Sequence, residues 1–249
     1  MTEDRLIDLY NSYFRVVRAD TDELRAEVYR LRFQVYAVEH SFERAEDFPD
    51  GMERDAFDEQ SLHSLLIHVP TGSIAGTVRL ILPIVAGSTR NLPIEHVCSE
   101  PLLQDDSPAL PRRSTAEVSR FAVPKSFRRR LGESGSPSGI TDESIEAEER
   151  RNREVADRRL APHITLGLIQ SLVEMSVEHG VTHWCAVMER ALLRLLTKIG
   201  IHFADLGPLV EYHGHRQPCY SDLRQLLERV RQERFDVWEI LTREGTLAP

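Results

Sequence analysis

Two apolar segments joined by a short turn limit most strongly how this chain can fold. Residues 62–69 read LHSLLIHV and residues 74–82 read IAGTVRLIL, with the turn sequence PTGS between them. This pattern predicts two antiparallel strands joined by a hairpin. Residues 116–123, AEVSRFAV, predict a third strand.

Segments with helical periodicity surround these strands. A first helix opens at Asp20 and Glu23, repeats apolar residues at helical spacing, and carries Arg32 and Tyr36 near its C-terminal end. Farther along, the predicted elements are a helix at 164–180, a strand at 181–188, a helix at 190–200 closed by Gly200, a strand-like piece at 203–214 and a helix at 222–243. This order indicates an α/β or α+β domain around a mixed sheet.

Length and composition favour one large domain or one domain with an embellishment. A chain of 249 residues with 41% hydrophobic residues can bury a sizeable core, so we expect a single domain over residues 1–249. Residues 131–160 interrupt it with a linker-like GESGSPSG and a charged ESIEAEERRNREVADRR, which predict either a disordered insertion or a solvated helix. Residues 221–243 are expected to form a C-terminal helical extension.

Charge and cysteine usage exclude several classes of protein. The formal net charge of -9 argues against a general nucleic-acid binder, which needs an excess of Lys and Arg. The start, MTEDRLIDLY, is acidic and amphipathic, and no apolar run is long enough to span a bilayer, so we expect a cytoplasmic protein without a transmembrane segment. Cys98, Cys185 and Cys219 form no CxxC pair and indicate neither a zinc site nor a disulfide framework. They are either buried free thiols or, less simply, include a catalytic one.

One pair of histidines and one histidine–cysteine pair suggest weaker hypotheses. His213 and His215 have the look of a metal pair, but no third ligand stands at a suitable spacing, so no metal is predicted. His183 and Cys185 share one face of a predicted strand without forming a usable triad. We expect His183 and Trp184 to line a cleft or the core.

An acidic loop and three arginines on other elements form the main candidate site. The loop ERDAFDEQS holds Glu53, Asp55 and Asp58 within six residues. A carboxylate run of this kind can be a solvated surface. It can also fold back onto arginines, whose planar fork suits a buried carboxylate. The candidate arginines are Arg32, Arg79 and Arg120.

These residues occur in an order that resembles the acyl-homoserine-lactone synthases. That family has an Arg and an aromatic residue on its first helix, a Glu-x-Asp-x-x-Asp loop, an Arg in a G-x-x-R-L strand and an E-x-S-R-F strand, and the likeness covers roughly the first half of this chain. A tryptophan usual in the family's N-terminal loop is absent, and Phe42 is the nearest aromatic residue. The matching positions are Arg32, Tyr36, Glu53, Asp55, Asp58, Arg79, Glu117, Ser119 and Arg120.

A closer resemblance, over nearly the whole chain except the charged insertion, is to the acyltransferases associated with PEP-CTERM/exosortase systems. The stretches EHSFERAEDFPDGMERDAFD, HWCAVMERALLRLL and GIHFADLGPLVEYHGHRQP carry this likeness. It extends to the N-acyl amino acid synthases, and all three groups have the Gcn5-related N-acetyltransferase (GNAT) fold. The resemblance therefore implies an α/β GNAT acyl-CoA N-acyltransferase fold, with a mixed central sheet whose strands 116–123 and 181–188 are splayed and flanked by helices.

The resemblance implies an N-acyltransferase that moves a fatty acyl group from an acyl carrier protein thioester to an amino acid or similar small amine. Strict alternation places Glu117, Ser119, Phe121 and Val123 on one face of their strand, with Arg120 on the other. Glu117 is expected to act as general base and Ser119 as its hydrogen-bonding support. The alternative is that Glu117 is a buried ion-pair partner of an arginine. The residues expected to bind substrate are Arg32, Tyr36, Phe42, Glu53, Asp55, Asp58, Arg79, Arg120, Phe121, Val123 and Trp184.

A local basic cluster follows the Glu117 strand. The sequence KSFRRR contributes Lys125, Arg128, Arg129 and Arg130, which we expect to bind an acidic acyl carrier protein. The following RRLGES departs from the R/Q-x-x-G-x-G/A loop of coenzyme A enzymes of this fold. No tightly bound cofactor is expected, and an acyl-phosphopantetheine thioester serves as co-substrate. A coenzyme A-dependent acetyltransferase and a non-catalytic carrier-protein-binding module remain as alternatives.

Overall fold

The computed structural model describes residues 5–83, 92–104, 107–128, 137–138 and 160–248. The chain divides into two compact units. The first unit comprises Met1–Ala56, His63–Val78 and Arg120–Ser171, and the second comprises Phe57–Leu62, Arg79–Ser119 and Leu172–Pro249. Several elements therefore contribute residues to both units. The predicted insertion at 131–160 lies almost entirely outside the described residues, and the expectation of a single domain stays a prediction.

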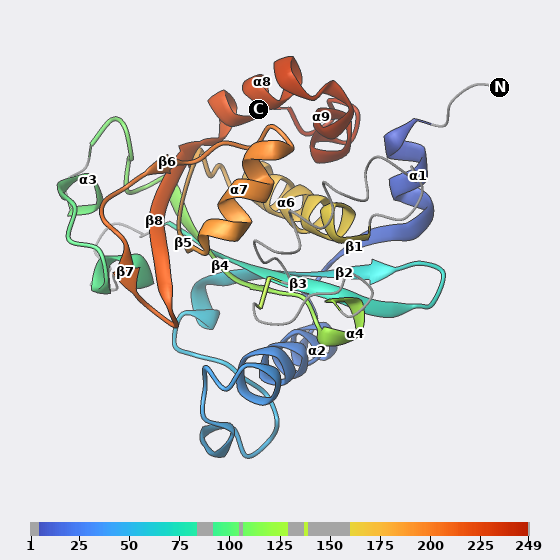
Figure 1. Ribbon diagram of the computed structural model, residues 1–249, viewed down its shortest axis with the longest axis vertical. Helices are drawn as coiled ribbons and strands as arrows, with labels where there is room; N and C mark the ends of the chain where they lie inside the picture. Colours follow the sequence, from blue (N-terminus) through green and yellow to red (C-terminus); the bar gives the residue numbers. More distant parts are fainter. Residues whose placement is uncertain (1–4, 84–91, 105–106, 129–136, 139–159, 249) are drawn as a thin grey trace. The chain divides into compact units, whose positions relative to one another are not determined.

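The first unit is built on strands in the order β1-β2-β3-β4, with helices on both faces of β2 and β3 (Figure 1). β1 and β2 pair antiparallel. The elements that lie wholly or partly in this unit are α1 (Leu6–Tyr13), β1 (Phe14–Arg18), α2 (Asp22–Arg32), β2 (Ser61–His68), β3 (Ser73–Ile81), β4 (Thr115–Ala122), α4 (Lys125–Arg128) and α6 (Leu160–Glu178). The predicted hairpin and third strand are confirmed to within one residue at each end.

Consecutive leucines of β2 supply the core on its two faces. Leu65 packs with Val28 of α2, whereas Leu66 meets α6 at Gly167. Because successive side chains of a strand point to opposite faces, one short segment contacts both layers of helix. This explains why β2 is apolar on both faces, whereas a strand with one solvated face would alternate.

Gly167 allows α6 to approach the sheet closely. A Cβ atom at this position would lie 2.5 Å from Leu66 Cδ1 and 2.8 Å from the Tyr10 hydroxyl oxygen. The Tyr10 hydroxyl is itself fixed, because it donates to Gln170 Oε1 at 2.8 Å, one helical turn along α6. Any larger residue at 167 must therefore displace a core leucine or a buried tyrosine.

The first predicted helix begins and ends differently from the expectation. Its N-cap is Thr21, whose hydroxyl accepts from the Leu24 N–H at 3.3 Å, so the start lies after Asp20. Regular α-helix stops at Arg32, and a π-helix continues from Phe33–Glu39. π-helical turns within α-helices are rare and often occur at functional sites. Tyr36 thus sits on a wider turn than helical spacing implied.

The second unit contains strands in the order β3-β4-β5-β8-β6, and β7 also pairs with β8. β4 and β5 run parallel, whereas β5 and β8 run antiparallel, so the sheet is mixed as predicted. The elements added by this unit are η4 (Pro93–His96), α3 (Pro101–Gln104), β5 (His183–Met188), α7 (Arg190–Lys198), β6 (Ala204–Asp205), β7 (Val210–Glu211), β8 (His215–Asp222), α8 (Leu223–Glu233) and α9 (Phe235–Thr242).

Parallel pairing between β4 and β5 is short. Its register runs from Thr115↔His183 to Val118↔Ala186, although β4 continues to Ala122 and β5 to Met188. Past the end of this register, Arg120 has a left-handed backbone with φ 51°. The regular pleat is interrupted there, so the strict alternation predicted from Glu117 to Val123 is wrong beyond Ser119.

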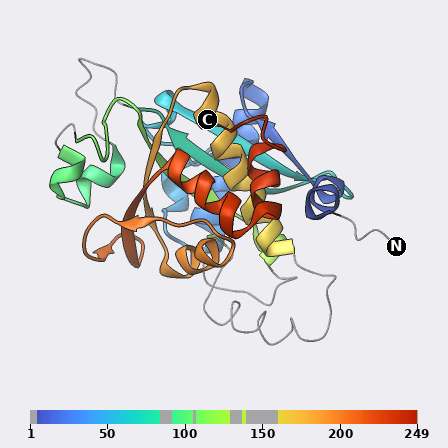
Figure 2. The ribbon, with the colours of Figure 1, turned by 90° about the horizontal axis from the view of Figure 1, so that it is seen from above.

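The sequence predictions were least accurate near the C-terminus. The strand-like piece at 203–214 contributes only the two-residue strands β6 and β7, whereas the long strand β8 was missed. The predicted helix at 222–243 is divided into α8 and α9 at Arg234, whose φ of -146° is not helical. Figure 2 shows α8 and α9 as two separate helices of this unit. Gly200 ends α7 as expected, with φ 87°.

Among the described residues, none of the helices combines the length and the apolar character needed to cross a bilayer.

Substitution of Gly167 by Ala is expected to lower the free energy of unfolding by about 1–3 kcal/mol, the usual cost of overpacking a filled core. The loss should shrink in a Leu66→Ala background, because the clashing methyl groups are then absent. Urea unfolding of the two single variants and the double variant measures this coupling. Strict additivity of the two losses would contradict the proposed contact.

Candidate functional site

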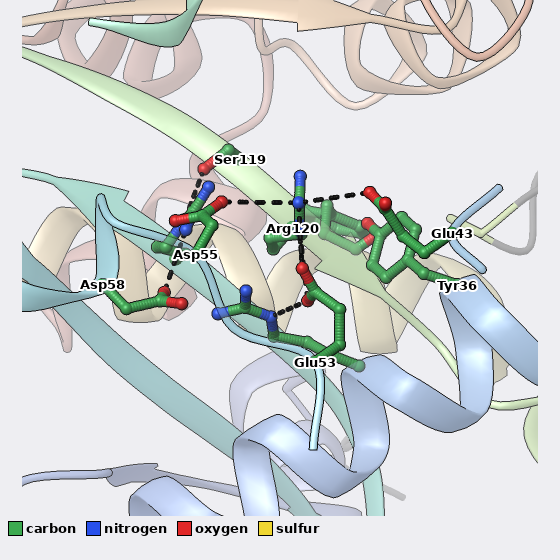
Figure 3. Close-up of polar contacts among 10 residues, drawn as sticks. Tyr36, Glu43, Glu53, Asp55, Asp58, Ser119 and Arg120 are labelled. Carbon is green, nitrogen blue, oxygen red and sulfur yellow. Dashed lines mark hydrogen bonds and ion pairs between the residues drawn. The ribbon is translucent and has the colours of Figure 1, made fainter. Parts of the chain in front are cut away.

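Glu53 is the centre of a buried ion-pair network in the first unit. Its Oε2 atom accepts from Arg32 Nε at 2.5 Å, and its Oε1 atom accepts from an Arg120 terminal nitrogen at 2.9 Å (Figure 3). The side chains of Glu53 and Arg32 are 1% and 0% exposed. The first residue of the predicted acidic loop therefore joins the end of α2 to β4.

The charges around Glu53 decide its protonation. Burial alone raises the pKa of a carboxyl group, but the guanidinium groups of Arg32 and Arg120 and their hydrogen bonds outweigh burial. They lower the pKa of Glu53 from 4.5 to about 2. Conversely, the negative charge of Glu53 raises the pKa of Arg120 against the effect of burial. The three groups are thus charged together over the whole physiological range of pH.

Arg120 connects this network to the partly exposed groups of the first unit. Its terminal nitrogen lies 3.5 Å from a Glu43 carboxylate oxygen and 3.4 Å from an Asp55 carboxylate oxygen. Its guanidinium carbon lies 5.3 Å from the centre of the Tyr36 ring, in a cation–π arrangement. The Tyr36 hydroxyl donates to the Phe121 carbonyl oxygen at 3.3 Å. One arginine therefore contacts three acidic side chains and one aromatic ring (Figure 3).

The network described in the first unit joins three carboxylates to two guanidinium groups. It contains the carboxylates of Glu43, Glu53 and Asp55 and the guanidinium groups of Arg32 and Arg120. The side chains of Glu43 and Asp55 are 26% and 29% exposed, so water and small solutes reach them. Burial raises the pKa of Glu43; Arg120 lowers it, and the neighbouring carboxylates raise it further. The partly exposed acidic side chains described in this network are thus those of Glu43 and Asp55.

A second arginine–carboxylate pair lies in the second unit. Arg79 donates to Asp58 at 2.9 Å, with side chains that are 1% and 6% exposed. Arg79 Nε also donates to the Ser119 hydroxyl at 2.9 Å (Figure 3). The expectation that Asp55 and Asp58 pair with arginines is confirmed. Their partners are Arg120 for Asp55 and Arg79 for Asp58.

Glu117 is buried in β4, one residue before the register with β5 ends. Its side chain accepts a hydrogen bond from the Ile94 backbone N–H at 2.8 Å. Cys185 is its partner across the parallel ladder. The role of Glu117 as a base stays a prediction, and its fixed carboxylate is compatible with that role.

The thiol beside Glu117 is poorly suited to nucleophilic chemistry. Burial raises the pKa of Cys185 well above its ordinary value of 9.0, and the charge of Glu117 raises it further. Burial raises the pKa of Cys219 also. A thiolate is the reactive form of cysteine, so these buried thiols have no such form near neutral pH. The structure thus favours the simpler interpretation of the cysteines, as buried free thiols.

Two aromatic residues predicted to bind substrate, Trp184 and Phe42, each stack on another ring. Trp184 is fully buried, donates to the Ser176 hydroxyl at 2.8 Å and stacks on Phe203. Phe42 stacks on His40 in the first unit.

The region after β4 is described only in part. Val123 is buried, and its N–H donates to the Pro137 carbonyl oxygen. Lys125 is exposed, and its N–H donates to the Glu39 carboxylate at 3.0 Å. The predicted Arg129 and Arg130 lie outside the described residues, as does the side chain of Arg128.

Sequence reasoning missed Glu43. It stands in the stretch SFERAED, where no spacing distinguishes it from the exposed Glu46 nearby. Only the fold of the loop after the π-helix brings it to Arg120. The left-handed backbone of Arg120 was also missed, because a non-glycine residue in this conformation leaves no pattern in the sequence.

Comparison with known proteins identifies the fold. Residues 31–135 match the family model described as acetyltransferase (GNAT) domain, which agrees with the acyltransferase predicted from the sequence. No curated protein sequence matches the chain.

Several solved structures resemble the chain at low sequence identity. TofI, in a ternary complex with an inhibitor and MTA, has a TM-score of 0.57 at 20% identity, over 88% of this chain and 96% of TofI. The CoA-dependent acyl-homoserine lactone synthase BjaI, with SAM and isopentyl-CoA, has a TM-score of 0.53 at 20% identity, over 94% of this chain and 99% of BjaI. FeeM, an N-acyl amino acid synthase from uncultured soil microbes, has a TM-score of 0.53 at 14% identity, over 89% of this chain and 97% of FeeM. The chain has the GNAT fold predicted from its sequence.

The stability of the protein is expected to fall between about pH 4.5 and pH 2 through protonation of Glu53. The folded pKa of about 2 lies below the ordinary 4.5, so the ionised carboxylate stabilises the fold above pH 4.5. This stabilisation is lost as the pH falls through 2, and it amounts to roughly 3 kcal/mol. Chemical unfolding at several pH values should give a flatter acid dependence for Glu53→Gln than for the wild type. Glu46→Gln, which changes an exposed carboxylate, should retain the wild-type slope. Equal slopes in all three proteins would contradict the depressed pKa.

Proposed function

We propose that this chain is an N-acyltransferase that moves a fatty acyl group from a phosphopantetheine thioester to the amine of an amino acid or similar small acceptor. The observation that carries the proposal is the end of the β4–β5 register at Val118↔Ala186, directly after Glu117. A strand that continues past its pairing offers backbone N–H and C=O groups to an extended ligand. A thioester carbonyl bound by such N–H groups gains on the order of 3 kcal/mol per well-placed donor in the transition state.

Direct attack of the amine on the thioester suits the residues beside this strand end. The reaction needs a neutral amine, and we assign removal of its proton to the Glu117 carboxylate, directly or through one water. The new C–N bond replaces the C–S bond of the thioester, and the phosphopantetheine sulfur takes up a proton and leaves as the free thiol. A covalent route through Cys185 is disfavoured, because burial and the charge of Glu117 raise the pKa of its thiol. Ser119, held by Arg79, is assigned a supporting role.

An acceptor that carries an ammonium group suits the network around Arg120. The partial exposure of the Glu43 and Asp55 carboxylates supports binding of a cation. FeeM is an N-acyl amino acid synthase, and BjaI was solved with SAM, a molecule with an amino acid end. We therefore extend the proposal to an amino acid or a relative of one.

An acyl carrier protein is the donor we propose, with Lys125, Arg128, Arg129 and Arg130 as its docking residues. Coenzyme A is the second candidate, because BjaI is described as CoA-dependent. The closer likeness to acyltransferases of PEP-CTERM/exosortase systems stays a prediction from the sequence. So does a non-catalytic, carrier-binding role, which the first test below separates from catalysis.

A host that expresses this chain is expected to accumulate an amide lipid that is absent from cells with the empty vector. The Glu117→Gln variant removes the base while keeping an acceptor for the Ile94 N–H, and it should lower the product at least 100-fold. Mass spectrometry of lipid extracts measures the amide lipid in cells that express the wild-type chain and in cells that express the variant. An amide lipid that is unchanged by Glu117→Gln would refute the base, and the absence of any amide lipid would favour the carrier-binding alternative.

Once the acceptor is identified, Glu43→Gln and Asp55→Asn are expected to raise its KM by about tenfold each, with a smaller effect on kcat. Each substitution removes one negative charge while keeping the size and the hydrogen-bonding oxygen of the side chain. Glu46→Gln provides the control, because its exposed carboxylate is not part of the network. Steady-state kinetics at fixed thioester concentration measure the acceptor KM and kcat of each variant separately. An unchanged acceptor KM in both network variants would overturn the assignment.

A further inference from the structure

The Glu117 carboxylate depends on a donor from a short turn. Ile94, the second residue of η4, donates its backbone N–H to Glu117 at 2.8 Å. A one-turn 3-10 helix has weak hydrogen bonds of its own and does not fix the direction of such an N–H group. Other contacts must therefore hold η4 in place.

Glu95, the next residue of η4, supplies one of these contacts. Its Oε1 atom accepts from the Leu92 N–H at 3.1 Å, while its own N–H donates to the Leu92 carbonyl oxygen at 3.0 Å. These two bonds close the turn on both sides of Ile94. The Glu95 side chain is only 8% exposed, so its charge needs a partner.

Arg112 provides that partner from the segment that leads into β4. Both of its terminal nitrogens lie 3.3–3.4 Å from Glu95 carboxylate oxygens. The same guanidinium donates to the Leu103 carbonyl oxygen just before the end of α3. Arg112 therefore joins η4, α3 and the approach to β4, and it stands five residues ahead of Glu117 in the chain.

Apolar packing also restricts the movement of Ile94. Its side chain is fully buried in an apolar cluster with Ile81, Leu110 and Cys185. Cys185 on β5 lies beside Glu117; burial raises the pKa of its thiol, and the charges of Glu117, Cys219 on β8 and Glu95 on η4 raise it further. Because two carboxylates lie near one buried thiol, each carboxylate depends on a correctly directed hydrogen-bond donor for its stabilisation.

We propose that the Glu95–Arg112 ion pair positions Glu117 for catalysis by holding η4 so that the Ile94 N–H stays directed at its carboxylate. The inference rests on the proposed function only in taking Glu117 as the base. Arg112 and Glu95 are positioning residues, since they act through Ile94. A hydrogen bond to the ionised carboxylate favours that form over the protonated one. Loosening η4 therefore raises the pH at which Glu117 becomes a usable base.

The Ile94 amide proton reports this directly. In the full chain labelled with 15N-isoleucine, its NMR signal, identified by its loss in Ile94→Val, should shift with pH as Glu117 titrates. This titration should vanish in Glu117→Gln. In Arg112→Gln we expect the midpoint to rise by about one pH unit. The midpoint of the acid limb of the kcat/KM profile should move to higher pH by the same amount. Arg113→Gln removes the neighbouring exposed arginine and should leave the midpoint unchanged.

The outcomes separate this inference from the proposed function. A wild-type midpoint in Arg112→Gln, together with a lowered melting temperature, makes the pair merely structural and overturns the inference. An Ile94 signal that does not respond to pH in the wild type overturns it also. If no acyl transfer is found but the Arg112→Gln midpoint rises, the positioning stands and the proposed function fails.

Discussion

The buried ion pairs of Glu53 are the interaction on which the first unit depends. Taking a carboxylate and two guanidinium groups out of water costs several kcal/mol per ion. Glu53 offsets this cost only because Arg32 and Arg120 both reach it with hydrogen bonds. Removing one partner of a buried pair typically destabilises a protein by about 3–5 kcal/mol. The loop after the π-helix is thereby held against α2 and β4.

The same pairing explains an unusual stretch of β4. A left-handed backbone at a non-glycine residue costs on the order of 1–3 kcal/mol and persists only when its contacts outweigh that cost. Arg120 has these contacts in Glu53, Glu43 and Tyr36. The interruption of the regular pleat at Arg120 divides β4 into two parts whose side chains make different contacts. Glu117 and Ser119 precede this interruption and belong to the second unit, whereas Arg120 belongs to the first unit and forms ion pairs there.

The sequence predicted well those features that follow from periodicity or from a motif. β2, β3 and β5 were found because apolar and β-branched residues dominate them, and the acidic loop was matched to its arginines through the family motif. β8 was missed because its sequence, HRQPCYSD, neither alternates nor is apolar, and Pro218 argues against an inner strand. Its burial comes instead from the long antiparallel register with β5. Glu43 and the conformation of Arg120 depend on tertiary contacts, which no local pattern records.

The neighbourhood of Glu117 favours proton transfer over covalent catalysis. A negative charge beside a buried thiol suppresses the thiolate, while a backbone N–H aimed at that charge stabilises the carboxylate. Both effects act in the same direction, since each makes Glu117 rather than Cys185 the ionised group. A site built for an acyl-cysteine intermediate needs the reverse arrangement, with a cation or a helix N-terminus beside the sulfur. The local electrostatics of β4 and β5 therefore match a reaction in which the acceptor amine, relieved of a proton, attacks the thioester itself.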